Sequence, residues 1–427
     1  MIRLLKSRPF LVVTGALLTL ASVLVVMNLG SSQKLEKSLV RHHALQDPCF
    51  QREMAVLLGP SIVDGNRVTA LQNGKEIFPE LLAAVRGAKS TITFETFIYW
   101  SGKVGTEMAE ALGERARAGV RVHVLLDWMG SSEMADDLLQ TMIRSGVHVR
   151  KYRPLSWYHL ARMNNRTHRK LLVVDGRLAF TGGVGIADFW QGDAGNPGEW
   201  RDSHYRIEGP VVAQVQAAFN DNWLKTTGTL LHGEGFFPRL EPVGSLGAQM
   251  FLASPAGGSE SMHLMYLLAI TAASHSIDLS AAYFVPDQLI VDALLKARKR
   301  GVNIRVLLPG KHTDSDTVRL ASKASWEPLL RAGIHIFEFQ PTMLHSKLLI
   351  IDNYLVSVGS TNFDIRSFHL NDEASLNVYD QGFAQSMTNV FEQDLKRAHL
   401  YSLDGWQKRP WTEKILEKFV IPLRQQL

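Results

Sequence analysis

The 427-residue chain has a single cysteine, Cys49, which excludes an internal disulfide and says little about the redox compartment. It also has no run of lysine and arginine interleaved with aromatic residues, so no nucleic-acid partner is expected. Hydrophobic residues make up 46% and charged residues 20%, the ordinary composition of a globular protein. The formal charge of +5 favours an anionic partner but does not by itself separate nucleic acid from anionic lipid.

One long apolar run is present, at the N-terminus. The residues from Pro9 to Gly30 carry no charge, and about 20 apolar residues are enough to cross a bilayer as a helix. No small-residue cleavage site stands out, so we expect an uncleaved transmembrane anchor at 1–30, with a removed signal peptide as the alternative. Three basic residues lie on each side of the run, so the count of positive charges does not decide its orientation. They are Arg3, Lys6 and Arg8 before the run and Lys34, Lys37 and Arg41 after it. A short basic head usually stays in the cytoplasm, which favours a globular body on the outer side of a cell membrane.

The most informative feature is a stretch that occurs twice. The segments beginning at His168 and at His345 both read H-x-K-x-x-x-x-D, with an aliphatic run between Lys and Asp. The same distance after each histidine comes a small-residue turn, Gly182-Gly183 in the first copy and Gly359-Ser360 in the second. One such octet can arise by chance, but two with the same turn at the same offset indicate a duplicated unit.

The duplication extends to the predicted secondary structure. A strand from Thr91 to Tyr99, a helix from Gly105 to Ala118 and a strand from Val120 to Asp127 are matched by a strand from Ser276, a helix from Asp287 to Arg300 and a strand from Val302 to Leu308. Such alternation predicts an α/β fold of two pseudo-symmetric halves, each a mostly parallel or mixed sheet flanked by helices. Ahead of the repeat, Asp64-Gly65 and Asn73-Gly74 predict hairpin turns.

The expected organisation follows the repeat, with a Gly- and Pro-rich join between the halves and an amphipathic basic helix with aromatic anchors at the end. That last helix either suits a lipid interface or packs on the body. The segments are an anchor at 1–30, a stalk at 31–53, a first half at 54–225, a linker at 226–260, a second half at 261–400 and a tail at 401–427.

The repeated residues can transfer a phosphodiester without a metal. The chemistry needs a nucleophile, a proton donor for the leaving oxygen and positive charge on the phosphoryl oxygens. The two histidines supply the first two, and Lys170 and Lys347 supply the third. In H-x-K on an extended chain, residues i and i+2 share one face, so each His and Lys project together. The motif histidines lack the nearby ligands of a zinc site, so no metal or other cofactor is expected in this chemistry.

The chain resembles the phospholipase D superfamily, whose two HKD motifs form one active site, and the flanking residues most resemble bacterial cardiolipin synthases. The resemblance implies that one histidine forms a phosphohistidine while the other acts as acid and base, and that Asp175 and Asp352 help to hold the motifs. One chain then suffices for a complete site. The flanks that carry the closer resemblance are Gly359-Ser360-Thr361-Asn362-Phe363-Asp364-x-Arg366-Ser367 with Asn371-Asp372-Glu373, and Trp200-Arg201-Asp202.

These flanks nominate further site residues. Ser360 and Asn362 are expected to donate hydrogen bonds, and Asp202 stands roughly where Glu373 stands in the repeat. Gly185 occupies the position of Asn362, so the first half lacks one polar donor. Glu95 matches an acidic position of the family and either approaches a motif residue or is a surface charge at a strand end.

The predicted function is a phosphatidyltransferase of cardiolipin synthase type, with phosphatidylglycerol as the expected substrate and a bacterial inner membrane as the location. The anchor, the basic tail and two apolar loop patches favour phospholipid; the patches are Trp157-Tyr158-His159-Leu160 and Leu230-Leu231 with Phe236-Phe237. A phospholipase D-type hydrolase, a membrane-tethered phosphodiesterase or nuclease, and a lipid-binding scaffold with a dead site remain as alternatives. We assign the nucleophile to His168, since resemblance to the superfamily favours the N-terminal copy.

Overall fold

The structure, a computed structural model, describes residues 12–16, 19, 22, 35, 37–154, 164–254 and 261–421. The predicted anchor therefore lies mostly outside the described residues, as does the apolar patch from Trp157 to Leu160. In the part of the chain that is described, no helix is both long enough and apolar enough to cross a membrane.

The first half contributes a seven-stranded part of the sheet. From edge to centre its strands are β4 (His148–Tyr152), β3 (Arg121–Asp127), β2 (Thr91–Thr96), β5 (Leu171–Val174), β6 (Leu178–Gly182), β7 (Ser203–Glu208) and β1 (Val63–Gln72). The aliphatic run of the first motif forms β5. This strand is buried along its whole length, which explains its unbroken Leu-Leu-Val-Val sequence.

The second half repeats that order. Its strands are β12 (His335–Phe339), β11 (Asn303–Pro309), β9 (Ser276–Ser280), β13 (Leu348–Ile351), β14 (Leu355–Gly359), β16 (Glu373–Tyr379) and β8 (Leu246–Ala253), with β17 (Ala398–Tyr401) added outside β12. Strand β13 carries the second motif and takes the place that β5 has in the first half. The two motifs are thus structurally equivalent.

The halves join through antiparallel pairing of β1 with β8, which makes a 15-stranded sheet of the described strands. Of the two predicted alternatives, a mostly parallel or a mixed sheet, the mixed sheet is confirmed. Within this sheet, the described strands that pair in parallel are β2, β3 and β4 and their counterparts β9, β11 and β12. Short turns join β5 to β6 and β13 to β14, and such turns allow only antiparallel neighbours. The longer connections from β6 to β7 and from β14 to β16 also lead to antiparallel neighbours.

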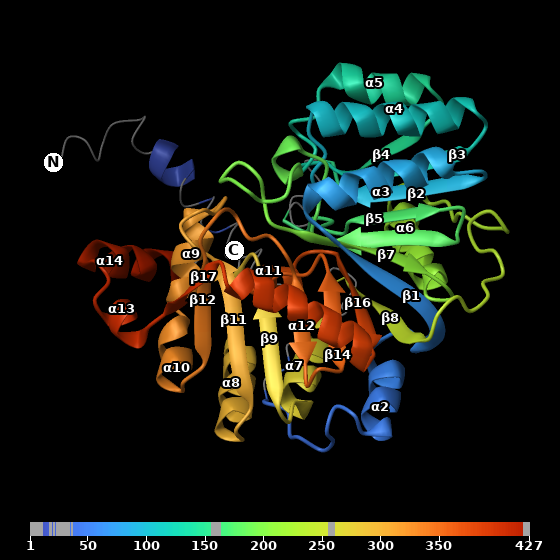
Figure 1. The fold of residues 1–427 in the computed structure, drawn as a ribbon. Coiled ribbons are helices and arrows are strands. Elements are labelled where there is room, and N and C mark those ends of the chain that lie inside the picture. Colours follow the sequence, from blue (N-terminus) through green and yellow to red (C-terminus); the bar gives the residue numbers. More distant parts are fainter. Residues whose placement is uncertain are drawn as a thin grey trace.

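Helices cover both faces of the sheet (Figure 1). The described helices are α2 (Pro48–Leu58), α3 (Asn73–Gly87), α4 (Lys103–Arg117), α5 (Asp136–Arg144), α6 (Val212–Thr227), α7 (Ser261–Ala272), α8 (Gln288–Lys299), α9 (Asp316–Lys323), α10 (Trp326–Arg331), α11 (Ile365–His369), α12 (Gln381–Leu395), α13 (Leu403–Gln407) and α14 (Trp411–Val420), with a 3-10 turn at Asp188–Trp190. Short strands β10 (Phe284–Val285) and β15 (Phe363–Asp364) pair separately.

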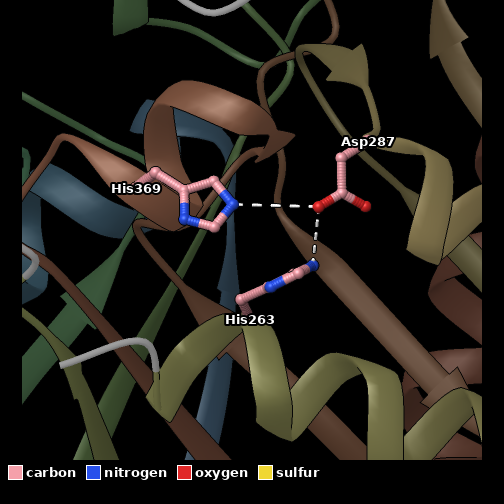
Figure 2. Close-up of side chains that lie close together, drawn as sticks. All are labelled: His263, Asp287 and His369. Atoms are coloured by element: carbon pink, nitrogen blue, oxygen red, sulfur yellow. Dashed lines mark ion pairs between the residues drawn. The ribbon is translucent and has the colours of Figure 1, made fainter. Parts of the chain in front are cut away.

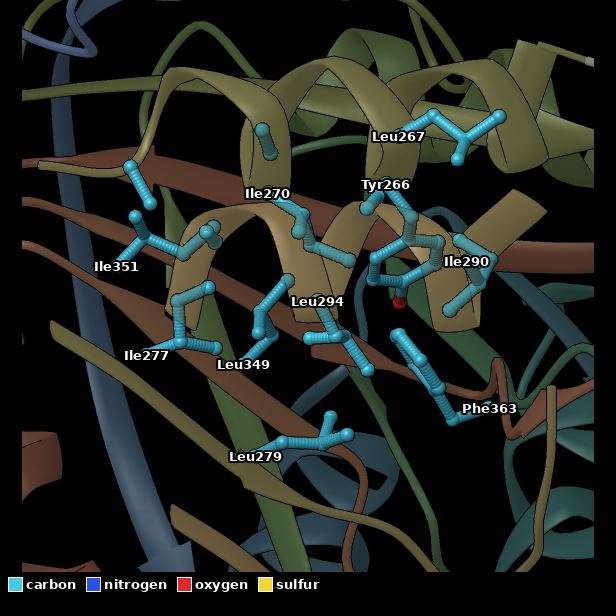
Figure 3. Close-up of a cluster of buried hydrophobic side chains, with 14 of the residues drawn as sticks. Tyr266, Leu267, Ile270, Ile277, Leu279, Ile290, Leu294, Leu349, Ile351 and Phe363 are labelled. Carbon is cyan, nitrogen blue, oxygen red and sulfur yellow. The ribbon is translucent and has the colours of Figure 1, made fainter. Parts of the chain in front are cut away.

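Three large apolar cores hold these layers. One lies between α3, α4 and α5 and the first-half strands, and its counterpart lies under α7 and α8 in the second half (Figure 3). The third joins the inner faces of α6 and α12 to strands of both halves. Because this core contains residues such as Phe219 and Phe391, the halves share buried surface and pack as one body.

The predicted hairpin turns at Asp64-Gly65 and Asn73-Gly74 are wrong. Gly65, at φ +90°, lies inside β1, where the register against β8 shifts, so the glycine serves a bulge. Asn73, at φ +58°, begins α3 instead of turning between strands. Each dipeptide contains a residue with positive φ, as turns do. However, the strands that pair with β1 are β7 and β8, which are distant in sequence, so neither dipeptide connects two paired strands.

The segments outside the two motifs are more structured than their composition suggests. The 226–260 segment contains β8, a central strand, and the 31–53 segment contains the first residues of α2, whose Phe50 is buried against the second-half core. Of the patch at the join, Leu231 and Phe236 are buried, whereas Leu230 and Phe237 are exposed.

Candidate active site

The two motifs meet where the halves face each other. The amide of His168 donates to the carbonyl of Asp372 at 2.8 Å, and the amide of His345 donates to the carbonyl of Arg201 at 2.7 Å. The backbone of each motif histidine is therefore held by the opposite half. The residue that holds it, Asp372 or Arg201, comes directly before the acidic residue Glu373 or Asp202. The chain is bridged there in parallel register, Thr167 with Asp372 and Arg201 with Leu344.

The same crossing places a carboxylate on each imidazole. His168 Nδ1 lies 2.9 Å from Oε1 of Glu373, and His345 Nδ1 lies 2.7 Å from Oδ2 of Asp202. Both carboxylates are fully buried. Asp202 and Glu373 stand at equivalent positions of the repeat, and each pairs with the histidine of the other half.

This pairing fixes the tautomer of both rings. The histidines hold the pKa of Glu373 and Asp202 below their usual values against the effect of burial, so the carboxylates are ionised and can only accept. Nδ1 therefore carries the proton, and Nε2 is left for the reacting phosphorus. Burial lowers the pKa of His168 to about 4 and also lowers that of His345, so both rings are neutral near pH 7.

The motif lysines are buried beside the rings. Lys170 Nζ donates to the carbonyl of His168 at 2.9 Å, and Lys347 Nζ lies 3.1 Å from Nε2 of His345. Burial lowers the pKa of Lys170 to about 7 and that of Lys347 to about 8, while Glu373 and Asp202 oppose the shift. A phosphodiester bound between them would favour their charged forms.

Different residues support the two carboxylates. Ser360 Oγ donates to Oε2 of Glu373 at 2.6 Å, so the structure places this serine behind the histidine instead of in the cavity. In the first half the equivalent residue is Gly183, and the Asp202 carboxylate occupies the space that a side chain there would need. The indole Nε1 of Trp190 donates to Asp202 at 3.0 Å and supplies the corresponding hydrogen bond.

Trp190 also explains the missing polar donor at Gly185. A Cβ at Gly185 would lie 3.0 Å from the Trp190 ring, so the indole fills the room that Asn362 has in the second half. Trp190 and Trp200 pack against His345 with ring centroids 5.4 and 5.2 Å away. The symmetry of the catalytic groups is therefore not shared by the walls around them.

Those walls enclose a cavity of about 620 Å³. Its lining includes both motif histidines, Lys170 and Asn362. The first half gives an aromatic wall and the second half a polar one; the aromatic wall is Phe97, Trp100, Phe189, Trp190 and Trp200, and the polar wall is Tyr283, Asp314, Asn362, Asp364, Arg366, Ser367 and Asn371. An apolar wall facing cations and amides suits a ligand with a phosphate and a hydrocarbon part.

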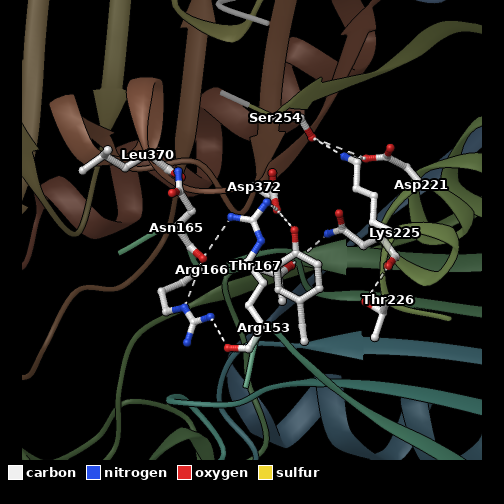
Figure 4. Close-up of polar contacts among 12 residues, drawn as sticks. Arg153, Asn165, Arg166, Thr167, Asp221, Lys225, Thr226, Ser254, Leu370 and Asp372 are labelled. Carbon is white, nitrogen blue, oxygen red and sulfur yellow. Dashed lines mark hydrogen bonds and ion pairs between the residues drawn. The ribbon is translucent and has the colours of Figure 1, made fainter. Parts of the chain in front are cut away.

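Two cations that line the cavity, Arg166 and Arg366, belong to neither motif. Arg166 is 2% exposed and donates through Nη2 to the carbonyl of Arg153 at 2.9 Å (Figure 4). Its Nε lies 3.5 Å from Oδ2 of Asp127. Its Nη1 has no hydrogen-bond partner among the described residues. A buried guanidinium nitrogen without a partner beside a cavity is a candidate contact for an anion.

The motif aspartates lie elsewhere. Asp175 accepts hydrogen bonds from the amides of Lys89, Ser90 and Thr91, and Asp352 accepts them from Ser274, His275 and Ser276. Neither lines the cavity, and each follows the far end of its strand from the histidine. The structure therefore does not bring Asp175 and Asp352 to the reacting groups; they tie strand ends to the loops before β2 and β9.

Glu95 is buried behind the first motif. It accepts hydrogen bonds from Thr167 at 2.6 Å and from Asn222 at 2.8 Å, so it contacts the residue before His168 without lining the cavity. Burial raises its pKa to about 7. The alternative of a surface charge at a strand end is wrong for Glu95.

Several residues that line the cavity were not predicted from the sequence, although the sequence contains a signal for one of them. Arg166, His168 and Lys170 alternate along an extended segment, so the rule that placed His and Lys on one face also applies to Arg166. The aromatic residues Phe97, Phe189 and Trp190 gave no comparable signal, because their positions depend on loops between strands.

Two crossed histidine–carboxylate pairs with two buried lysines define a site for phosphodiester transfer through histidine, the kind of site that two HKD motifs build. The chain belongs to the family described as "Cardiolipin synthase, PLD-like domain", whose model matches residues 81–188 and 266–395.

Relatives and solved structures agree with that assignment. The chain is 33% identical over 371 residues to cardiolipin synthase 1 of Bacillus cereus, covering 85% of this chain and 72% of that protein. It is 33% identical over 355 residues to cardiolipin synthase of Geobacillus kaustophilus, covering 82% and 70%. Its fold is similar to the crystal structure of phosphatidylserine synthase from Haemophilus influenzae, with a TM-score of 0.66 at 11% identity, over 89% of this chain and 99% of that one.

Proposed function

We propose that the protein joins two phosphatidylglycerol molecules into cardiolipin and releases glycerol. The observation that carries the proposal is the crossed site, in which both imidazoles present Nε2 to one cavity with a lysine beside each. Membership of the cardiolipin synthase family supports this choice of lipid.

In the first step, Nε2 of His168 attacks the phosphorus of one phosphatidylglycerol. The anionic phosphodiester favours the charged form of the neighbouring ring, so His345 takes up a proton from water as the lipid binds. The bond between phosphorus and the headgroup glycerol oxygen then breaks, and His345 gives this proton to that oxygen. Glycerol leaves, and the phosphatidyl group stays on His168. Lys170 and Lys347 balance the charge on the nonbridging oxygens.

In the second step, a headgroup hydroxyl of another phosphatidylglycerol takes the place of glycerol. His345, now neutral, removes the hydroxyl proton while the oxygen attacks phosphorus, and the bond to His168 breaks. The product is cardiolipin, and both histidines return to their starting states. Glu373 and Asp202 stabilise the positive charge that each ring acquires in turn.

The acceptor lipid brings a phosphate that does not react. We assign this phosphate to Arg166 and Arg366, which line the cavity from opposite halves. The unpartnered Nη1 of Arg166 supports the assignment, since a buried guanidinium nitrogen gains most from a charged acceptor.

The membrane location is part of the same proposal. The segment 1–30 acts as an anchor, and α14 adds a contact with the lipid surface. An ion pair of Lys323 with Glu413 at 2.9 Å holds α14 to the body, while Trp411 and Leu416 stay 72% and 52% exposed. A helix held in this way with apolar side chains outside suits a bilayer interface.

The test uses purified full-length protein with phosphatidylglycerol labelled in the headgroup glycerol and in the acyl chains. Cardiolipin and free glycerol are expected in equal amounts. Accumulation of phosphatidic acid alone, with acceptor lipid abundant, would show a hydrolase and reject the proposal. His345→Ala should abolish turnover, and full activity in that variant would remove His345 from the chemistry.

A further inference from the structure

A second cluster of metal-ligating side chains lies outside the cavity. His263 is on α7, Asp287 is the N-cap residue of α8, and His369 is the last residue of α11 (Figure 2). The side chains converge from three elements that are far apart in the sequence. None of the three takes part in the phosphoryl-transfer chemistry described above.

The distances suit one small cation. His263 Nε2 lies 2.9 Å from Oδ2 of Asp287, and His369 Nε2 lies 3.7 Å from the same oxygen. One ligand atom from each residue falls within 4.8 Å of the other two. A tetrahedral zinc ion with bonds of about 2.0 to 2.2 Å holds its ligand atoms roughly 3.3 to 3.5 Å apart, so only small rotations are needed.

The contact between His263 and Asp287 is also unlike an ordinary hydrogen bond. Nε2 of His263 is buried and close to the carboxylate, yet it makes no hydrogen bond of acceptable geometry. A buried imidazole nitrogen without a well-formed hydrogen bond calls for another partner, and a metal ion would supply one. The other carboxylate oxygen of Asp287 is occupied by the amide of Ile290 at 2.9 Å, which fixes the orientation of the group.

Burial distinguishes this cluster from a solvated group of polar residues. The side chain of His263 is 2% exposed, that of His369 is 13% exposed and that of Asp287 is 21% exposed. His263 packs against Phe368 with ring centroids 5.3 Å apart. The cluster is thus enclosed on the protein side and retains an approach for a water ligand.

We propose that His263, Asp287 and His369 bind one divalent transition-metal ion of the zinc type, with water as the fourth ligand. Two neutral imidazoles and one carboxylate form a ligand set that zinc commonly takes in proteins, and oxygen-only cations such as Mg²⁺ are disfavoured by it. The proposal does not depend on the lipid substrate or on the direction of phosphatidyl transfer.

The ion would connect the cavity wall to the body of the second half. Helix α11 carries Arg366 and Ser367, which line the cavity, and ends at His369. Coordination ties that end to α7 and α8. Metal binding therefore stabilises the wall that holds the acceptor phosphate, and its role is structural.

The experiment titrates ZnCl₂ into untagged, chelator-treated full-length protein by calorimetry. One ion per chain is expected, and thermal unfolding should shift upward with zinc. Asp287→Asn retains an N-cap side chain but removes the charge, so it tests the ligand without removing the helix cap. His369→Ala removes a ligand that is partly exposed.

Both variants should bind zinc at least about tenfold more weakly, while His335→Ala, which removes an exposed histidine of the same half, should bind as the unmodified protein does. Cobalt(II) should give the intense visible absorption of four-coordinate geometry in the unmodified chain and in His335→Ala, but not in the two cluster variants. If the unmodified protein takes up no zinc, or the two cluster variants bind it equally well, the trio is a plain polar contact between helices and the proposal is wrong.

Discussion

At the scale of single residues, the two carboxylates that pair across the halves are expected to be essential for efficient turnover. Glu373 and Asp202 fix the tautomer and compensate the charge that each imidazole acquires. Glu373→Gln and Asp202→Asn keep the shape but lose the charge, so turnover should fall by about 10- to 100-fold or more. Labelled-lipid turnover measures this, and Glu392→Gln, on a surface ion pair, should leave turnover unchanged. Unaltered rates in both site variants would contradict a role for the crossed pairs.

The buried lysines predict the pH dependence. A lysine must be charged to balance the phosphoryl oxygens, and its charge is lost as pH rises through its pKa. Since the pKa is about 7 for Lys170 and about 8 for Lys347, kcat/KM should fall with rising pH across that interval. Lys170→Arg keeps its charge and should move the alkaline fall to higher pH, at a lower maximal rate. A profile of the unmodified enzyme that stays flat between about pH 6 and 10 would contradict this assignment.

At the scale of elements, the motif aspartates predict stability effects without large catalytic ones. Asp352 accepts three amide hydrogen bonds at φ +52°, a backbone conformation that asparagine tolerates. Asp352→Asn should lower the free energy of unfolding by about 1 to 3 kcal/mol, because the charged acceptor is lost. Denaturant unfolding measures the loss. Activity per folded molecule should stay within a few-fold, and a complete loss would instead place Asp352 in the chemistry.

The C-terminal helix gives a second prediction at this scale. With Cys49→Ser as background, a polarity-sensitive dye on Trp411→Cys should shift to shorter wavelength when anionic vesicles are added. The same dye on Asp404→Cys, an exposed position whose charged side chain faces water, should shift much less. Equal responses at the two positions would show that α14 does not contact lipid through its apolar side.

At the scale of the whole molecule, the two-fold repeat does not decide which histidine is the nucleophile. Before lipid binds both rings are neutral, and both present Nε2 to the cavity. Acid-labile phosphate trapped from labelled lipid should be found on the His168 peptide after mapping. Phosphate on the His345 peptide of the unmodified protein, still present in His168→Ala, would reverse the assignment.

The sequence by itself determined the reaction class and the repeated α/β architecture. Two H-x-K octets with equivalent flanks are a local pattern, and alternation along an extended chain already places His beside Lys. The same alternation also places Arg166 on the face of the chain that carries His168 and Lys170. The carboxylates were identifiable as equivalent positions, because duplication preserves their offset from each motif.

Only the tertiary structure decided how these residues combine. Glu373 pairs with His168 and Asp202 pairs with His345 because of the way the halves face each other. Local sequence patterns carry no information on such contacts. The antiparallel centre of the sheet, the replacement of a serine hydrogen bond by Trp190 and the convergence of His263, Asp287 and His369 have the same origin. Each depends on which distant segments share a small volume, which is settled by packing of the whole chain.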